Sequence, residues 1–316
     1  MTIPPQDEPI GLPSSGSVGA NKPPIALTIA GFDPSNGAGV TADLQVFAAH
    51  GLFGTSAVTA LTIQSTISVA AVDLIWPSNL RETLNHLTTD LPPAGIKIGM
   101  LGSAEMVLEV LDYLQQSDES SPLKALIPIV LDPVLRSSSG SLLLDLKGLE
   151  LLREQLLDQV TWITPNWQEL GLLTRTEVTT LKAAAGALDL LHDRYPHLHA
   201  VATGGDQTSP IDLLLTPAGV IHQFRGKRIE TTSTHGTGCA FSSALLSRLI
   251  LREPPIPAVT SAKLYVESAL LHAPGLGNGR GPLDLLWPLR QPRSLPVDTP
   301  RTSAPAMRPK GFRLHT

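Results

Sequence analysis

The sequence predicts an α/β fold in which a mainly parallel central sheet is covered by helices on both faces. Between about residue 25 and about residue 288, short apolar or β-branched runs alternate with amphipathic segments of helical spacing. Strand–helix alternation of this kind is typical of parallel sheets buried between helices. After residue 205 the rhythm changes, and two consecutive strand-like runs predict antiparallel strands at one edge of the sheet.

Six apolar runs are expected to form the buried strands: 25–31, 56–64, 95–101, 126–134, 160–165 and 199–205. The antiparallel pair is expected at 211–219 and 220–230. Amphipathic spacing predicts helices at 38–51, 79–91, 103–116, 148–160 and 180–195, and two closing helices at 236–253 and 258–273. No linker-like stretch divides these elements, so a single domain is expected over residues 25–288.

Both ends of the chain differ from this core in composition. Residues 1–24 are rich in Pro, Gly and Ser, and residues 289–316 combine many prolines with many basic side chains. Such segments bury little apolar surface, so both are expected to be disordered. The basic tail is interpreted as a solvated segment, with contact to acidic partners as the alternative.

Composition excludes several classes of function. The formal net charge of −5 argues against a general nucleic-acid binder. A single cysteine cannot form an internal disulfide, and no apolar run reaches the roughly 18 residues that span a bilayer. The first residues lack the basic start and apolar centre of a signal peptide. We therefore expect a cytoplasmic protein that binds neither membrane nor nucleic acid.

The only cysteine follows a glycine-rich turn, "THGTGC", in front of a predicted helix. A helix N-terminus offers unpaired N–H groups and a partial positive charge, and Gly236 and Gly238 would let the backbone approach an anion. The turn is interpreted as a phosphate or oxyanion cradle. In it the pKa of Cys239 is expected to fall below the usual value of about 8.5. The alternative is a buried cysteine that packs as a small apolar residue.

Two further strand ends carry candidate chemistry. In "TPNWQEL", Asn166 and Glu169 share one face of a helix start, where they could orient Mg²⁺ against ATP phosphates. The alternative is plain helix capping. Asp132 ends an apolar strand, where burying an unpaired carboxylate costs free energy. It could act near a metal or a phosphate, or the Asp-Pro pair could mark an ordinary turn.

The first strand leads into the glycine-rich stretch "AGFDPSNGAG" and then a helix that carries Asp43. This loop is not the dinucleotide fingerprint, and no Walker loop occurs in the chain. Gln64 ends the second strand and could present a paired donor and acceptor to a heterocycle, or be an exposed strand-end residue. All these turns fall at the carboxyl ends of strands, where such sheets bind ligands.

Together these stretches resemble the hydroxymethylpyrimidine/phosphomethylpyrimidine kinases of thiamine biosynthesis, within the ribokinase-like superfamily. The resemblance covers roughly residues 25–285 and rests on eight motifs in the family order: "ALTIAGFDPSNGAGVTADLQ", "TALTIQST", "IKIGML", "VLDPV", "ITPN" with Glu169, "GG" at residues 204–205, "THGTGC" and "GRGP". It implies a ribokinase-like fold and assigns roles to individual residues.

By this resemblance Gln64 reads the aminopyrimidine ring. The positions that would line the same pocket are Gly31, Asp43, Met100, Val134 and His235. Cys239 matches the cysteine that stands where related sugar kinases carry an aspartate base. Gly236 and Gly238 would belong to the anion hole. The cysteine is therefore expected to accept the proton of the hydroxymethyl group.

The resemblance also implies ATP as phosphoryl donor and Mg²⁺ as cofactor. Asn166 and Glu169 match the superfamily "NxxE" element, and Thr203 and Gly204 match the strand-end turn that meets the nucleotide. Asp132 and Glu169 would hold the metal. Relatives of this kind suggest a homodimer.

The sequence departs from the family pattern at three places. Ser138 and Thr203 stand where family members often carry lysines, and Asn36 replaces one of two paired glycines. Two cations that could neutralise phosphates are therefore missing, and Arg136 or Lys97 would have to compensate. The activity implied is phosphorylation of 4-amino-5-hydroxymethyl-2-methylpyrimidine and then of its monophosphate. The alternatives are a pyridoxine/pyridoxal kinase and a catalytically impaired, pyrimidine-binding regulatory relative.

Overall fold

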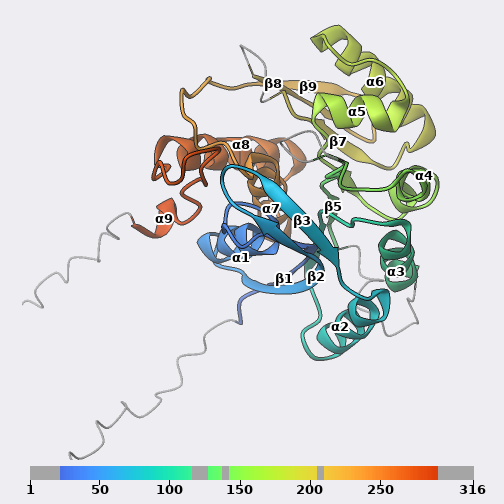
Figure 1. Ribbon diagram of the computed structural model, residues 1–316. Coiled ribbons are helices and arrows are strands. Elements are labelled where there is room, and N and C mark those ends of the chain that lie inside the picture. The colour runs from blue at the N-terminus through green and yellow to red at the C-terminus, as the bar shows by residue number, and fades with distance from the viewer. Residues whose placement is uncertain (1–21, 116–126, 137–141, 205–209, 291–316) are drawn as a thin grey trace, which may run out of the picture.

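The computed structural model describes residues 22–115, 127–136, 142–204 and 210–290 (Figure 1). The terminal segments expected to be disordered lie almost wholly outside these ranges. At the C-terminal boundary, the short helix α9 (Trp287–Arg290) continues two residues beyond the expected end of the domain. In the described ranges, no helix has the length and apolarity needed to cross a bilayer.

One nine-stranded sheet organises the described chain, in the order β3-β2-β1-β4-β5-β6-β7-β8-β9. The strands are β1 (Ile25–Phe32), β2 (Phe53–Gln64), β3 (Val69–Leu74), β4 (Gly95–Ile98), β5 (Ile129–Leu131), β6 (Trp162–Ile163), β7 (His199–Ala202), β8 (Ile211–Leu215) and β9 (Ile221–Arg225). From β2 to β7 the neighbouring strands pair in parallel, whereas β3, β8 and β9 pair antiparallel at the edges. The expected mainly parallel sheet with antiparallel edge strands is confirmed.

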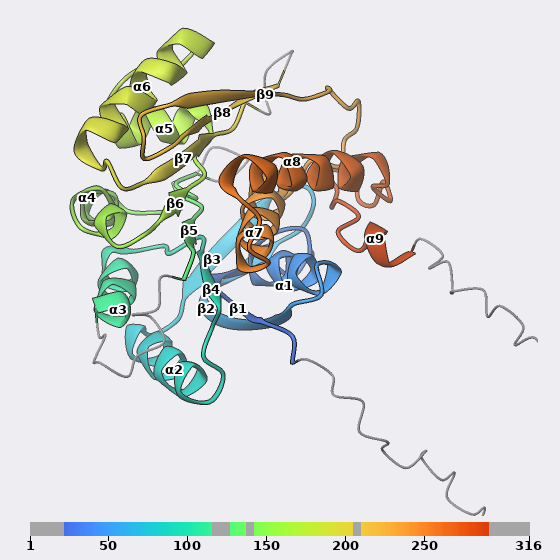
Figure 2. The ribbon, with the colours of Figure 1, turned by 180° about the vertical axis from the view of Figure 1, so that it is seen from behind.

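Two layers of helices cover the sheet, as Figures 1 and 2 show from opposite sides. On one face lie α1 (Gly39–Ala49), α7 (Thr237–Ile250) and α8 (Pro255–Leu271), whose buried residues share one apolar core. The other face carries α2 (Pro77–Asp90), α3 (Ala104–Gln115), α4 (Leu146–Glu154), α5 (Trp167–Thr174) and α6 (Leu181–Arg194). Each face of the sheet is thereby buried.

Two elements differ from the prediction. The segment expected to be one helix over 148–160 forms α4 and then a separate 3-10 turn at Leu156–Asp158. Helix α4 starts earlier because the side chain of Asp145 accepts a hydrogen bond from Gly148 N at 2.6 Å and so caps its N-terminus. Strand β3 (VAAVDL) was not predicted, although its sequence is apolar; it pairs with β2 alone at the edge of the sheet and is only partly buried.

The strand order positions the site. Strand β1 lies between β2 and β4 and is parallel to both. The chain runs from β1 to β2 and β3 on one side, and then crosses to the other side of β1 to form β4, so the order of the strands reverses at β1. Ligands of open α/β sheets bind in the crevice at the carboxyl ends beside such a switch point. Along β4, Ile96 and Ile98 join the apolar core under α2 and α3, and Lys97 points to the opposite face, toward α1 and α7. A charged side chain is thus carried into the interior below the crevice.

We expect Phe47→Ala in α1 to lower the free energy of unfolding by about 3–5 kcal/mol, because this fully buried ring fills the core under α1. Urea unfolding measures the change. Phe53→Ala is the matched control, since Phe53 is 51% exposed at the start of β2 and its loss should cost less than about 1 kcal/mol. Equal losses in the two variants would contradict the packing described here.

Candidate active site

A cavity of about 720 Å³ opens at the carboxyl ends of the strands. Most of the residues predicted for the site line it: Gly31, Gln64, Met100, Asp132, Val134, Asn166, Glu169, Thr203, His235, Gly236, Gly238 and Cys239. Two predicted residues, Asp43 and Gly204, do not. Residues from Ala30 to Arg280 that are far apart in the sequence therefore line one cavity, with Gln64 and Cys239 among them.

The loop that follows β1 is held by one aspartate that the sequence analysis did not single out. The Asp33 carboxylate accepts hydrogen bonds from the backbone of Ser35 at 2.8 Å and of Ala38 at 2.9 Å. Asn36 has a φ of 64°, so it adopts the left-handed conformation for which glycine and asparagine are suited. The asparagine that replaces a family glycine is therefore compatible with this turn.

The turn before α7 interlocks with this loop. His235 Nε2 lies 2.7 Å from Asp33 Oδ2, across the cavity wall. Gly236 caps α7 with a φ of 82°, and a Cβ there would lie 1.9 Å from the carbonyl oxygen of Gly37. Burial alone would raise the pKa of Asp33, but the hydrogen bonds from His235 and Ser35 outweigh it and lower the pKa below its usual value. The two glycine-rich turns thus form one unit.

The N-terminus of α7 has no side-chain cap in the described part of the chain. Its first backbone N–H groups therefore keep their hydrogen-bonding capacity beside the cavity, where Gly236, Thr237, Gly238 and Cys239 all contribute to the lining. The absence of a Cβ at Gly238 leaves the backbone accessible from the cavity side. This geometry suits an anion, as the sequence predicted for the turn.

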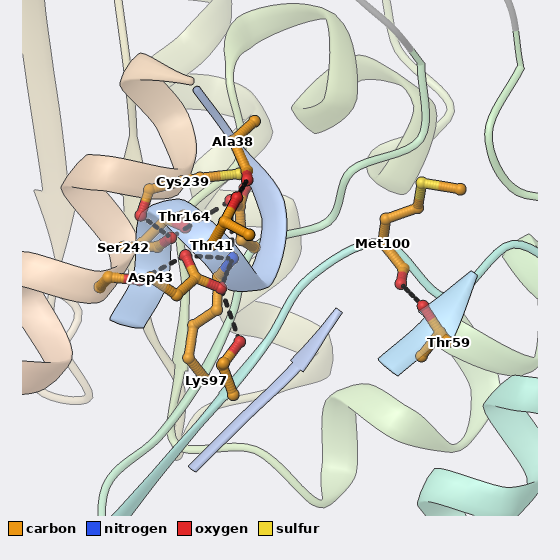
Figure 3. Close-up of polar contacts among 12 residues, drawn as sticks. Ala38, Thr41, Asp43, Thr59, Lys97, Met100, Thr164, Cys239 and Ser242 are labelled. Carbon is orange, nitrogen blue, oxygen red and sulfur yellow. Dashed lines mark hydrogen bonds and ion pairs between the residues drawn. The ribbon is translucent and has the colours of Figure 1, made fainter. Parts of the chain in front are cut away.

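A buried ion pair joins Asp43 to Lys97, which lines the cavity (Figure 3). The Lys97 ammonium is 3.0 and 3.1 Å from the two oxygens of Asp43, and 3.8 Å from Asp132 Oδ2. Asp43 also accepts hydrogen bonds from Thr28 at 2.6 Å and from Ser243 at 2.7 Å. Burial disfavours the charge of Lys97, but Asp43, Cys239 and Asp132 outweigh it and raise its pKa. Lys97 is therefore ionised and fully engaged.

Two expectations are corrected by this ion pair. Asp43 does not line the substrate pocket, because its carboxylate turns inward to the ammonium and two hydroxyl groups. Lys97 lines the cavity but is not a free cation for phosphates, since its ammonium is buried and paired with Asp43. Arg136, the other cation named for this role, also lines the cavity, and its compensating role stays a prediction. The role of Lys97 in the fold is to neutralise carboxylates under the anion-binding turn.

The expectation of a lowered cysteine pKa is also wrong for the ligand-free chain. Cys239 is partly exposed, yet burial of its sulfur raises the pKa to about 12. The Lys97 charge lowers it, whereas the negative charges of Asp132 and Asp43 raise it. Burial is the largest of these effects. At neutral pH the ligand-free protein therefore carries a thiol.

Asn166 and Glu169 form a capping box at the start of α5, which confirms the capping explanation. Glu169 N donates to Asn166 Oδ1 and Asn166 N donates to Glu169 Oε2, each at 2.9 Å. Both residues also line the cavity, so capping and ligand binding are compatible. Burial, with the nearby charge of Asp132, raises the pKa of Glu169 to about 8. Burial likewise raises the pKa of Asp132, against the opposing effect of Lys97.

The residues present fit a hard divalent cation. Asp132 and Glu169 are two buried carboxylates that line the cavity, and the charge of Asp132 raises the pKa of Glu169. The described residues contain no cluster of three metal-ligating side chains. This suits Mg²⁺, which is usually held by one or two carboxylates and completed by water and phosphate oxygens.

Thr203 and Gly204 lie at the end of β7, next to α5. Thr203 N donates to Pro165 O at 2.9 Å, which brings this strand end beside Asn166. Gly204 is buried behind the cavity, and its N–H donates to Asp212 Oδ1 at 2.9 Å. Gly204 therefore supports the turn without lining the cavity. Ser138 and Gly205 lie outside the described residues.

The sequence analysis missed Asp33, Asp212 and Arg280. Asp33 stands in the Asp-Pro turn "FDPSN", a signal that marked the loop but not its contact with His235. Asp212 lies inside an apolar strand, where a lone carboxylate indicates a buried partner. That partner is Lys263 Nζ, 2.5 Å from Asp212 Oδ2. Arg280 lies in the "GRGP" motif and lines the cavity, but no local pattern distinguishes it from a solvated arginine.

Because the thiol is protonated, Cys239 should react slowly with iodoacetamide. At pH 8 we expect alkylation of the folded chain to be roughly tenfold or more slower than that of the same chain unfolded in urea. The rate should increase as the pH rises toward the pKa of about 12. The chain has one cysteine, so its mass reports the reaction directly. A folded chain that reacts faster than the unfolded chain would indicate a thiolate.

Removing the buried ammonium should destabilise the fold. Lys97→Met leaves the Asp43 carboxylate buried without its partner, and we expect a loss of about 3–5 kcal/mol in the free energy of unfolding. Urea unfolding measures this loss. Lys182→Met is the matched control, because Lys182 is exposed on α6 and its removal should change stability by less than about 0.5 kcal/mol. A Lys97→Met variant as stable as the wild type would contradict the ion pair.

Comparison with known proteins agrees with this geometry. The family model described as phosphomethylpyrimidine kinase matches residues 33–284. The hydroxymethylpyrimidine/phosphomethylpyrimidine kinase of Synechococcus elongatus is 36% identical over 269 residues, which cover 84% of this chain and 98% of the relative.

Two solved structures show the same fold. The pyridoxal kinase from Staphylococcus aureus in complex with pyridoxal superposes with a TM-score of 0.74 at 27% identity, covering 86% of this chain and 96% of that one. The phosphomethylpyrimidine kinase from Clostridium difficile superposes with a TM-score of 0.65 at 30% identity, covering 78% of this chain and 99% of that one. The chain belongs to the phosphomethylpyrimidine kinase family.

Proposed function

We propose that this chain transfers the γ-phosphoryl group of ATP to 4-amino-5-hydroxymethyl-2-methylpyrimidine, and then phosphorylates the resulting monophosphate. One observation carries the proposal: Gln64, the anion-binding turn with Cys239, and the Asn166–Glu169 element all line one cavity. A ring reader, a phosphate cradle and a carboxylate pair on one surface are the parts that phosphoryl transfer to a small heterocyclic alcohol requires.

Each part has a distinct task in the proposed reaction. The Gln64 amide presents a donor and an acceptor to the edge of the aminopyrimidine ring. The N–H groups at the start of α7 stabilise the charge on the transferring phosphoryl group. Asp132 and Glu169 would hold Mg²⁺, and the bound ion would supply positive charge to the phosphate oxygens. Thr203 would meet the nucleotide from the end of β7.

Cys239 is the group that we place beside the hydroxymethyl oxygen. A general base must accept the proton of this alcohol, and only the thiolate can do so. Burial raises the pKa of Cys239, Lys97 lowers it, and the charges of Asp132 and Asp43 raise it further. The base role therefore requires that the Asp132 charge be compensated when the substrates are bound.

The pyridoxal kinase alternative has one specific observation in its favour. The pyridoxal kinase from Staphylococcus aureus superposes with the higher TM-score of the two solved structures described above. Sequence favours the pyrimidine kinases, since the Synechococcus relative is 36% identical to this chain. A homodimer stays a prediction. The regulatory alternative, in which Ser138 and Thr203 in place of lysines impair catalysis, also stays a prediction.

Product analysis tests the function directly. We expect the purified chain, with Mg²⁺ and ATP, to convert the hydroxymethylpyrimidine to species heavier by one and then two phosphoryl groups, observed by mass spectrometry. Pyridoxal is tested in parallel, and we expect its kcat/KM to be lower. Tight binding of the pyrimidine without any product would favour the regulatory alternative. A higher kcat/KM for pyridoxal would favour the pyridoxal kinase.

Cys239→Ala should lower kcat for the first phosphorylation by roughly 10²–10⁴, the usual contribution of a general base, with a smaller effect on KM. The monophosphate is already largely ionised at neutral pH, so its phosphorylation needs no base. The same variant should therefore retain the second phosphorylation to a much larger extent. Rates measured separately with the alcohol and the monophosphate check this. Nearly unchanged turnover of the alcohol would make the thiol structural.

Gln64→Ala should mainly raise KM for the pyrimidine, because the variant loses the amide that reads the ring and keeps the phosphate cradle. Steady-state kinetics with varied pyrimidine and saturating ATP measure the effect, and KM for ATP is the internal control. An unchanged KM for the pyrimidine would remove Gln64 from the substrate site.

A further inference from the structure

A second cavity, of about 530 Å³, adjoins the first beside the turn that joins β2 to β3. The two cavities share five lining residues: Gln64, Val69, Thr234, His235 and Arg280. Cys239 and the Asn166–Glu169 element line the first cavity alone. The second cavity, which we name the outer cavity, therefore meets the first at the proposed pyrimidine end, away from the nucleotide residues.

The lining of the outer cavity suits a polar, hydrogen-bonding ligand such as an aminopyrimidine ring. Its other lining residues are mainly hydroxyl-bearing or amide residues: Ser65, Thr66, Ser68, Thr231, Thr232 and Asn278, with Ile67 and Gly279. No carboxylate occurs among the described residues that line it. Nothing in this lining repels a phosphate, and one guanidinium lies at the boundary with the first cavity.

That guanidinium belongs to Arg280, whose backbone is fixed at the boundary. Arg280 N donates to Thr66 O at 2.9 Å, and the next residue, Gly281, accepts from His235 N at 3.1 Å. His235 directly precedes the anion-binding turn. Arg280 is exposed, and among the described residues its side chain has no ion-pair partner. By contrast, Lys97 is fully engaged with Asp43, and both Lys97 and Arg136 line the first cavity but not the outer one.

The two proposed substrates differ by one phosphate, and this difference constrains where each ring can lie. In both transfers the attacking oxygen must reach the same γ-phosphorus beside the start of α7. In the second transfer that oxygen belongs to the phosphate of the monophosphate. The phosphate then occupies the space next to Cys239, and the ring must lie further from the thiol by the length of a phosphate group.

We propose that the outer cavity and Arg280 form the subsite for the second transfer. The displaced pyrimidine ring enters the outer cavity, and Gln64, which lines both cavities, contacts the ring in either position. Arg280 binds the phosphate that the first transfer has added. An oxygen of this phosphate attacks the γ-phosphorus, the bond to the ADP oxygen breaks, and ADP leaves. The inference rests on the proposed function and deepens it.

Filling the outer cavity tests the position of the ring. Thr232 is exposed, and it lines the outer cavity only. We expect Thr232→Trp to lower kcat/KM for the monophosphate by about tenfold or more, and that for the alcohol by less than about threefold. Thr260→Trp, the same change at an exposed position of α8, is the control for insertion of the ring. Equal losses with both substrates, or no loss with either, would overturn the proposal.

Removing the guanidinium tests the charge. Arg280→Gln should lower kcat/KM for the monophosphate by about 10- to 100-fold, the usual effect of losing a charged hydrogen-bond donor, with a smaller loss for the alcohol. Arg280→Lys should restore part of it. Calorimetry gives a second readout: the variant should bind the monophosphate more weakly and the alcohol nearly as well as the wild type. Unchanged binding of the monophosphate would overturn the proposal.

Failure of this inference is distinguishable from failure of the proposed function. A wild-type chain that does not phosphorylate the alcohol refutes the function. A wild-type chain that stops at the monophosphate keeps the first activity and overturns the subsite. A chain that makes both products, with variants that affect both transfers equally, also overturns the subsite while leaving the function in place.

Discussion

The buried ammonium of Lys97 is the constraint on which the site depends. It lies on β4, and its ion pair with Asp43 holds α1 against the sheet. Ser243 of α7 donates to the same carboxylate, and Ser242 donates to Asp132 at 3.2 Å after β5. Four segments, β4, α1, α7 and the end of β5, thus meet around one charge. Burying charges is costly, and this cost is offset only because each carboxylate oxygen has partners.

This arrangement determines how the two glycine-rich turns meet. Each turn precedes one of the two helices that the ion pair fixes, α1 and α7. With the helices in place, His235 reaches Asp33 and Gly236 lies against the backbone of Gly37. Burial of the sulfur raises the pKa of Cys239, Lys97 lowers it, and the charges of Asp132 and Asp43 raise it further. The buried charges that hold the helices therefore also act on the cysteine.

Much of the fold could be predicted from sequence because its signals are local. Apolar strand-like runs and amphipathic segments gave the parallel sheet and both helix layers, and turns at strand ends gave the rim where the cavity lies. Strand β3 was missed although its sequence, VAAVDL, is apolar; the six-residue run gives no alternation of polar and apolar residues that would mark an edge strand. The start of α4 depended on a cap, Asp145, that lies before its amphipathic pattern.

For the site, prediction failed where the cause was not local. A helix N-terminus lowers a cysteine pKa in isolation, but the carboxylate of Asp132 comes from a strand more than a hundred positions earlier in the chain. Asp43 resembles a pocket residue by motif, yet it faces the interior because Lys97 lies there. For Glu169 the sequence allowed either helix capping or metal binding. The structure shows the capping box, and Glu169 also lines the cavity, so experiment must test the metal role.

The central claim is that the thiol, the anion-binding turn and Gln64 face the reacting groups in one cavity. A crystal structure with the hydroxymethylpyrimidine, Mg²⁺ and a non-hydrolysable ATP analogue tests it most directly. The account predicts the ring edge on the Gln64 amide, the hydroxymethyl oxygen within hydrogen-bond distance of Cys239 Sγ, and the terminal phosphate at the start of α7. A ring bound elsewhere, or a hydroxymethyl group directed away from the sulfur, would contradict it.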